Sequence, residues 1–176
     1  WRASKLLSLT SSFLQLFVFF FIWLGFDFSS PFLQYNVFFV PFAGSPFTVH
    51  LALDGLSLYF VFLSVLLLPI VILCSWVTVS TRVVEFQILL HVITFLLILV
   101  FSTQDLLLFY IFFESILIPM FFIIGVWGSR DRKVHAAYQF FLYTLGGSVL
   151  MLISIIYLYS LVGSTHIFTL LNHDFS

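Results

Sequence analysis

Five apolar stretches, each about as long as the hydrocarbon core of a bilayer is thick, constrain the fold of this chain more than any other feature of its sequence. A helix needs about 20 apolar residues to cross that core of ~30 Å. Hydrophobic residues make up 62% of the chain and charged residues only 7%, whereas a soluble domain is about one quarter charged. We therefore predict an all-α polytopic membrane protein, a single membrane domain over 1–176 with helices near 6–26, 56–79, 86–101, 106–127 and 136–162.

The first stretch follows Arg2 and Lys5, an arrangement that is also typical of a secretory signal peptide. The run from Leu6 to Phe26 is bulky, is about as long as a membrane span, and is not followed by a small-residue cleavage site. These features favour a retained first helix.

The basic residues fall on one side of the membrane when the chain is threaded up and down through the five stretches. Short separators make successive helices antiparallel neighbours. The cations collected on this side are Arg2, Lys5, Arg82, Arg130, Arg132 and Lys133. The positive-inside rule makes this side the cytoplasm or, in a mitochondrion, the matrix. The Arg130–Lys133 loop is expected to be a topological anchor, with binding of anionic lipid as the alternative role. A net charge of −1 offers no basic surface for nucleic acid.

The outer connection between the first and second helices contains a predicted β-hairpin. Apolar and polar residues alternate over 47–53, which is the period of a strand. The segment 34–41 can pair with it across Ala43-GSP. Asp54 then occupies the N-cap position of the second helix, with proton uptake as the alternative role, and Asp105 has the capping position of the fourth.

Glu114 is a lone carboxylate deep inside the fourth apolar stretch. At about 1.5 Å per residue it lies roughly 13 Å from the outer end of the helix, close to mid-membrane. An ionised carboxylate costs at least about 2.5–3.5 kcal/mol there, so a chain that keeps one usually uses it. Tyr110, one turn earlier, shares its face and can donate a hydrogen bond. Pro119 lacks an N–H, so the carbonyl of Ser115 loses its helical donor.

A buried carboxyl with a movable cationic partner can take up and release protons, because burial favours the neutral acid and a nearby cation favours the carboxylate. No Lys or Arg of this chain can be that partner of Glu114, since all six lie at the basic edge. The cation would therefore come from outside this chain. The alternative is a neutral carboxyl that is hydrogen-bonded between helices.

His91 is the only histidine well inside a predicted helix. It is separated from Glu114 by roughly 9 Å in depth, so either a proton relay through a short water chain or a satisfied packing histidine is expected. On the fifth helix, His135, Tyr138 and Gln139 fall on one side. They are expected to line an uptake route from the basic side or to face the lipid headgroups.

Two further features limit the chemistry of the chain. Gly146-GS in the fifth helix is expected to let a neighbouring backbone approach closely. The single cysteine, Cys74, lies in an apolar stretch, so this chain alone cannot build a disulfide framework, a zinc site or an iron–sulfur cluster. Any redox chemistry must belong to other chains.

The run Asp105-LLLFYIFFESILIPMFFIIGVWGSRDRKVHAAYQFFLYTLGGSVLML resembles the subunit 4 family of respiratory NADH:ubiquinone oxidoreductase (complex I), particularly its mitochondrial form. Leu51-ALDGLSLYFVFL and Gly163-STHIFTLL resemble an outer loop and a later segment of the same family. The resemblance covers most of 51–176.

This resemblance implies an antiporter-like membrane-arm subunit of an enzyme that couples NADH oxidation and ubiquinone reduction to proton pumping. Glu114 matches a glutamate of the proton path that works with a lysine on a later, broken helix. FMN, iron–sulfur clusters, NADH and ubiquinone would be bound by other subunits, and no cofactor by this chain. The expected membrane is the mitochondrial inner membrane, with the bacterial plasma membrane as the alternative.

Neither the family's lysine nor a broken helix occurs in this sequence. We therefore expect a fragment, either the product of a split gene or a truncated sequence, that is completed by a separate chain with the rest of the subunit. Two other functions stay open. One is a subunit of a multisubunit cation/proton antiporter, and the other is a purely structural fragment that seals the membrane arm.

Overall fold

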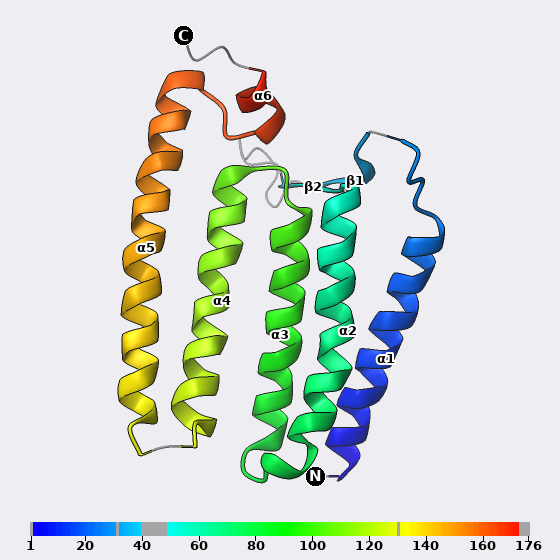
Figure 1. Ribbon diagram of the computed structural model, residues 1–176, viewed down its shortest axis with the longest axis vertical. Coiled ribbons are helices and arrows are strands. Elements are labelled where there is room, and N and C mark those ends of the chain that lie inside the picture. The colour runs from blue at the N-terminus through cyan, green and yellow to red at the C-terminus, as the bar shows by residue number, and fades with distance from the viewer. Residues whose placement is uncertain (1, 31, 40–48, 130, 173–176) are drawn as a thin grey trace.

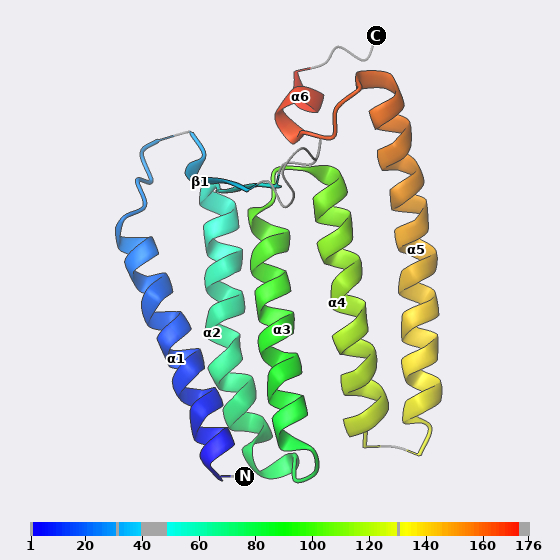
Figure 2. The ribbon, with the colours of Figure 1, turned by 180° about the vertical axis from the view of Figure 1, so that it is seen from behind.

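Five long helices stand side by side in chain order in the computed structural model, which describes residues 2–30, 32–39, 49–129 and 131–172 (Figures 1 and 2). All five are long and apolar enough to cross a membrane. They are α1 (Arg2–Leu24), α2 (Gly55–Thr78), α3 (Val83–Ser102), α4 (Leu106–Trp127) and α5 (Lys133–Val162). The predicted fold class and the antiparallel order of neighbouring helices are confirmed.

Two helices begin three residues earlier than the apolar pattern predicts, and a sixth is added. Helix α3 starts at Val83 because Glu85 is tolerated in its first turn, where the helix dipole favours a negative charge. Helix α5 starts at Lys133, whose Nζ donates a hydrogen bond to the carbonyl of Val126 at 2.6 Å. The short α6 (Ile167–Leu171) was not predicted.

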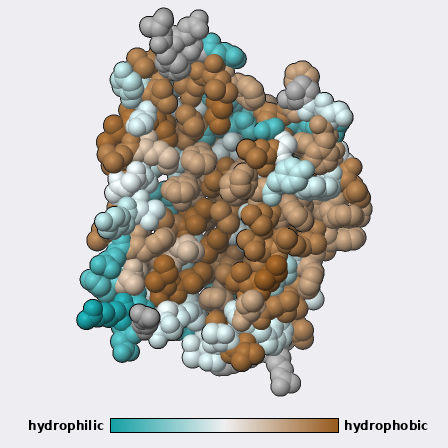
Figure 3. All heavy atoms as spheres, in the orientation of Figure 1, coloured by the Kyte–Doolittle hydropathy of each residue, from teal (hydrophilic) through white to brown (hydrophobic). Residues whose placement is uncertain are grey.

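One end of the bundle collects the basic residues, as predicted. The start of α1, the α2–α3 turn and the α4–α5 turn lie together at this end (Figure 1), and hydrophilic surface gathers at the α4–α5 turn (Figure 3). Lys5 Nζ donates to the carbonyls of Trp76 at 2.6 Å and Val79 at 3.3 Å, at the end of α2. Lys5 and Lys133 therefore also satisfy carbonyls that a helix end leaves without partners.

The α4–α5 turn is closed by Gly128, which gives a testable expectation. A Cβ at this position would lie 2.5 Å from the carbonyl oxygen of Ile124 and 2.7 Å from Cβ of Lys133. Replacing Gly128 with Ala should therefore destabilise the subunit by about 1–3 kcal/mol, the usual cost of overpacking. Gly55→Ala is the matched control, because a Cβ there meets nothing within 4 Å. Thermal unfolding of the solubilised assembly would measure both, and equal midpoints would contradict the expectation.

The opposite end carries the predicted β-hairpin. Strands β1 (Gln34–Phe39) and β2 (Val49–Leu53) pair antiparallel, with a register irregularity between Gln34 and Val37. The strand pattern is therefore confirmed, while the predicted turn at Ala43-GSP lies outside the described residues. Asp54 accepts a hydrogen bond from the Gly55 amide at 2.7 Å, which confirms its capping role.

The hairpin is fastened to the helices through Gln104. Its backbone N–H donates to the carbonyl of His50, and its side-chain amide donates to the carbonyl of Ala52. The carbonyl of Gln104 in turn accepts from the N–H of Ile167 at the start of α6. One buried residue thus joins the hairpin, the α3–α4 turn and the segment after α5.

His50 makes this junction sensitive to pH. The ring stacks on Phe38 with centroids 4.2 Å apart, and the His166 ring is 5.2 Å away. Burial, and after it the charge on His166, lowers the pKa of His50 below the ordinary value of about 6.5. Because the unfolded hairpin binds the proton more readily, the contribution of neutral His50 is present above about pH 6.5 and is lost as the pH falls through the lowered pKa.

We expect the hairpin to loosen below about pH 6.5 in the native protein. Hydrogen exchange at the Gln104 amide, corrected for its intrinsic pH dependence, should speed up there, because that amide donates to His50. In His50→Phe, which can still stack on Phe38, the corrected rate should not change with pH. A pH-independent rate in the unaltered chain would contradict the expectation.

Candidate functional site

Glu114 is held in place by the cap of α4. Asp105 Oδ1 accepts hydrogen bonds from the backbone amides of Leu107 at 2.9 Å and Leu108 at 3.2 Å, which confirms the predicted N-cap. Its second oxygen accepts from Thr165 Oγ1 at 2.5 Å. The start of α4 is thereby tied to the segment after α5, and Glu114 follows within the same unbroken helix.

Both carboxylate oxygens of Glu114 are buried and have no hydrogen-bond partner in the part of the chain that the structure describes. The predicted donor Tyr110 does not reach them, and the hydroxyl of Ser115 donates instead to the carbonyl of Ile111 at 2.7 Å. The alternative of a carboxyl hydrogen-bonded between helices is therefore not realised among the described residues. An unpartnered buried acid has a strong requirement for a proton or a cation.

The side of α4 that bears Glu114 faces α5. Helical spacing places Glu114 on one face with Phe121 and Gly125. The Phe121 ring contacts the Tyr138 and Phe141 rings at centroid distances of 5.4 and 5.8 Å. A Cβ on Gly125 would lie 3.7 Å from Cβ of Ala137.

The register of the two helices sets what lies level with the carboxyl. Glu114 comes eleven residues before Gly125, and Ser148 comes eleven after Ala137. Because α4 and α5 are antiparallel and rise equally per residue, Ser148 is at the depth of Glu114. The Gly146-GS segment therefore sits at the level of the carboxyl.

The expected close backbone approach at Gly146 is not found in the described chain. A Cβ on Gly146 or on Gly147 would meet nothing within 4 Å. Helical spacing places Gly146 on the side of α5 opposite Ala137, which is the residue that a Cβ on Gly125 of α4 would contact. Room for another backbone thus exists on α5 at the depth of Glu114.

Pro119 lies within α4 and is buried, as predicted. It has no N–H to donate to the carbonyl four residues earlier, that of Ser115, so a free acceptor follows Glu114 directly. An unpartnered carboxyl and a carbonyl without its helical donor therefore belong to consecutive residues of α4.

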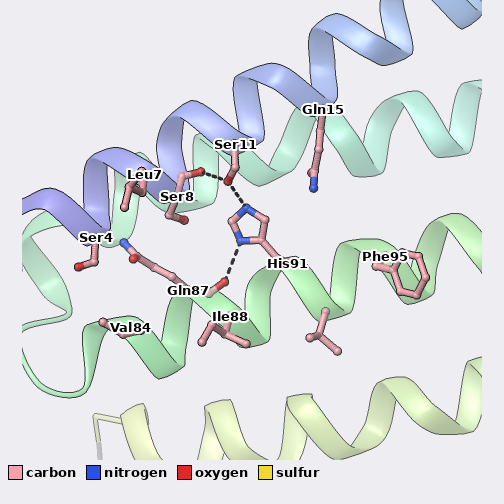
Figure 4. A pocket seen from close by; sticks show the side chains of 11 residues that line it. Ser4, Leu7, Ser8, Ser11, Gln15, Val84, Gln87, Ile88, His91 and Phe95 are labelled. Carbon is pink, nitrogen blue, oxygen red and sulfur yellow. Dashed lines mark hydrogen bonds between the residues drawn. The ribbon is translucent and has the colours of Figure 1, made fainter.

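His91 is not brought to Glu114. Its Nδ1 donates to the carbonyl of Gln87 at 2.9 Å, and its Nε2 lies 2.8 Å from Ser11 Oγ of α1. Figure 4 shows the ring reaching from α3 toward α1, while the yellow-green ribbon of α4 lies on the other side of α3. The relay from His91 to Glu114 thus lacks a direct geometric basis in this chain.

The three α5 residues that were predicted to lie on one side, His135, Tyr138 and Gln139, do not all line the same cavity. His135 and Gln139 line a cavity of about 790 Å³ at the basic end, together with charged residues of the α4–α5 turn. Tyr138 instead turns its ring toward Phe121 of α4. An uptake route along His135 and Gln139 is therefore compatible with the geometry, whereas Tyr138 packs.

Sequence reasoning missed a polar row on α1. Ser4, Ser8, Ser11 and Gln15 recur at spacings of four, three and four residues, and all of them line one cavity with Gln87 and His91 of α3. That helical spacing was the signal that could have found the row. It forms a second polar region, separate from Glu114.

Metal ligation has no obvious place among the residues that the structure describes, where no three His, Cys, Asp or Glu side chains gather into a group that could hold an ion. Cys74 is exposed on α2. The described chemistry is therefore that of carboxyl, imidazole and hydroxyl groups.

Comparison with known proteins places these features in a family. The family model described as "NADH:quinone oxidoreductase/Mrp antiporter, TM" matches residues 103–175, which include Glu114. The chain is 46% identical over its whole length to NADH-ubiquinone oxidoreductase chain 4 of Prototheca wickerhamii, of which it covers 37%. It is 43% identical over 99% of its length to NADH-quinone oxidoreductase subunit M of Rhodobacter capsulatus, of which it covers 33%.

A solved structure agrees with these relatives. A chain in respiratory complex I from Thermus thermophilus with bound NADH matches 98% of this chain with a TM-score of 0.76 and 26% identity. This chain covers 35% of that one, so it spans about a third of the length of the proteins it matches. The chain therefore belongs to the chain 4 family of antiporter-like membrane subunits of NADH:quinone oxidoreductase.

Proposed function

We propose that this chain is part of a proton-translocating membrane-arm subunit of NADH:ubiquinone oxidoreductase, with Glu114 as its intramembrane proton carrier. The observation that carries this proposal is the buried carboxyl of Glu114, whose two oxygens have no partner in the described chain. Such a group holds its proton until a cation approaches, and it takes the proton back when the cation leaves.

The cation is proposed to come from the rest of the subunit, in a separate chain that carries the lysine and the broken helices absent here. Two observations support this. The relatives are about three times as long as the part that this chain covers, and α5 has open space at Gly146 and Gly147 at the depth of Glu114. A helix could pack along these glycines, at the depth of the carboxyl, without displacing a side chain.

In this mechanism Glu114 transfers a proton and no redox step takes place within the chain. Dry, uncharged surroundings favour the neutral form of a carboxyl group. The arrival of a lysine ammonium favours ionisation, and the released proton leaves through water or through the lysine itself. NADH, FMN, iron–sulfur clusters and ubiquinone would act in other subunits and drive the movement of charge.

The proposed membrane is the mitochondrial inner membrane, with the Arg82 loop and the Arg130–Lys133 loop on the matrix side. Its support is the gathering of basic residues at one end of the bundle, together with the positive-inside rule. Other membrane-arm subunits and lipids would cover the apolar helix surfaces, which are broad (Figure 3).

The composition of the native assembly tests the class of the protein. Affinity purification through a tag on this chain should recover a large complex with flavin and iron–sulfur proteins, and with a chain that carries the missing lysine. A small assembly without redox subunits would contradict the proposal. The outcome does not depend on whether Glu114 is the proton carrier.

A cation/proton antiporter subunit is the second candidate, because the matching family model describes both kinds of protein. It predicts sodium-dependent proton transport by an assembly that lacks flavin and iron–sulfur clusters. A purely structural fragment, the third reading, predicts normal pumping when Glu114 is replaced by an apolar residue.

A further inference from the structure

A second polar region lies between α1 and α3, on the side of α3 that faces away from α4 (Figure 4). It is a cavity of about 560 Å³ whose lining combines serine, glutamine and histidine side chains with leucine, valine, isoleucine and phenylalanine, and we call it the α1–α3 cavity. Along α1 it extends from Ser4, in the first turn, to Gln15. These are eleven residues apart, which at about 1.5 Å per residue spans roughly 16 Å from the basic end toward mid-membrane.

Two atoms in this cavity call for a ligand. Ser8 is only 8% exposed, and neither its Oγ nor Oε1 of Gln15 has a hydrogen-bond partner among the described residues. A buried polar atom without a partner carries a desolvation penalty in a dry cavity. A buried water needs only ≳ 10–15 Å³ of accessible volume and two to four polar partners. Ser8 and Gln15 both line the α1–α3 cavity, which offers far more than this volume.

His91 adds a proton-binding group to the middle of the cavity. His91 and Ser11 take part in a chain of three hydrogen bonds that runs between two backbone carbonyls, those of Gln87 and Ser8. Nδ1 of His91 pairs with the carbonyl of Gln87 at 2.9 Å, and Nε2 of His91 pairs with Ser11 Oγ at 2.8 Å. Ser11 Oγ in turn pairs with the carbonyl of Ser8 at 2.8 Å. Carbonyls only accept, so the complete chain needs a hydrogen on each of Nδ1, Nε2 and Oγ.

Neutral His91 cannot complete that chain. A neutral imidazole carries one ring hydrogen, and here it lies on Nδ1 for the bond to the carbonyl of Gln87. The hydroxyl hydrogen of Ser11 is then the only other one in the chain of bonds, and it can be donated either to Nε2 of His91 or to the carbonyl of Ser8, but not to both. A proton from water supplies the missing hydrogen to Nε2, and its departure breaks one link. The imidazole and the serine hydroxyl therefore form a group that is built to exchange a proton.

We infer that the α1–α3 cavity is filled with water and is open to the basic side of the membrane, and that His91 exchanges protons with this water. The ligand class is water and its excess proton. This site is distinct from the Glu114 site, since His91 reaches toward α1 and α4 lies on the other side of α3. It therefore stands whether or not Glu114 carries protons.

Cysteine labelling in the intact complex tests the hydration. In a Cys74→Ser background, Gln15→Cys is compared with Leu14→Cys, which has the same depth on α1 but whose native leucine is 62% exposed outside the cavity. A cationic methanethiosulfonate added to the basic side reacts with the thiolate, which forms in water. We expect Gln15→Cys to react at least about tenfold faster than Leu14→Cys. Equal rates would overturn the inference.

Modification of His91 tests the proton-binding group. Diethyl pyrocarbonate carbethoxylates unprotonated imidazole, and mass spectrometry of the intact complex after reaction reports the product at His91. We expect His91 to be modified, and we expect Val84→Trp, at the mouth of the cavity, to slow the reaction at least about tenfold. Ser8→Phe, which fills the cavity, is the second variant if Val84→Trp does not assemble. An unreactive His91, or a rate that neither variant changes, would overturn the inference.

Discussion

Replacing Glu114 with Gln is expected to leave the complex assembled while lowering proton pumping and coupled quinone reduction by about 10²-fold or more, the range in which loss of a proton-transfer group falls. Gln has the shape of the neutral acid, and Glu114 has no hydrogen bond in the described chain that the change would remove. Only the capacity to release a proton is lost. Proton uptake by vesicles that contain the purified complex, set against electron transfer on NADH, would measure the effect.

Two neighbouring changes serve as controls for this loss. Ser115→Ala removes only a hydroxyl that donates to the carbonyl of Ile111, and Tyr110→Phe removes one that does not reach Glu114. Both should pump at close to the normal rate. Full pumping by an assembled Glu114→Gln complex would contradict the carrier role and would favour a neutral packing residue.

The sequence was sufficient for the membrane architecture because the cost of exposing polar backbone to lipid leaves few solutions. The five helices, the hairpin strands and the caps at Asp54 and Asp105 all follow from local patterns. Helix ends were less predictable, since a charged residue such as Lys133 can lie inside a helix when its own side chain reaches a free carbonyl.

The direction of side chains across the bundle could not be predicted. His91 and Glu114 lie on adjacent helices, yet one faces α1 and the other lies on the face of α4 that meets α5. Depth follows from counting residues along a helix, whereas rotation about the helix axis is decided by packing between helices. The same gap explains why the sequence could not show that no helix of the described chain packs closely at Gly146.

The polar row on α1 was overlooked for a different reason. A serine in an apolar helix can satisfy its hydroxyl on a carbonyl of the preceding turn, as Ser12 does with Leu9 at 2.8 Å. In the sequence, therefore, a serine within an apolar helix does not by itself indicate a polar site. The structure distinguishes the two serines. Ser8 lines the cavity shared with α3, and its hydroxyl has no partner among the described residues, whereas Ser12 does not line that cavity.

Replacing Asp105 with Ala should have the second largest effect, a loss of roughly 2–4 kcal/mol of stability. The change removes the cap of α4 at the amides of Leu107 and Leu108, worth about 1 kcal/mol. It also removes the hydrogen bond that Thr165 donates to Asp105, which is stronger than a neutral one because its acceptor is charged. Thermal unfolding and native-gel assembly of the complex would measure the loss.

Asp54→Ala is the matched control, because Asp54 caps α2 through a single amide, that of Gly55. It should cost only about 1 kcal/mol. Asp105→Asn should recover most of the cap, since Asn is an equally good N-cap residue, but not the charge-assisted bond to Thr165. An Asp105→Ala complex as stable as the unaltered one would mean that the outer junction at Gln104 holds α4 in place without the cap. An Asp54→Ala complex that assembles normally but does not pump would instead assign Asp54 to proton uptake.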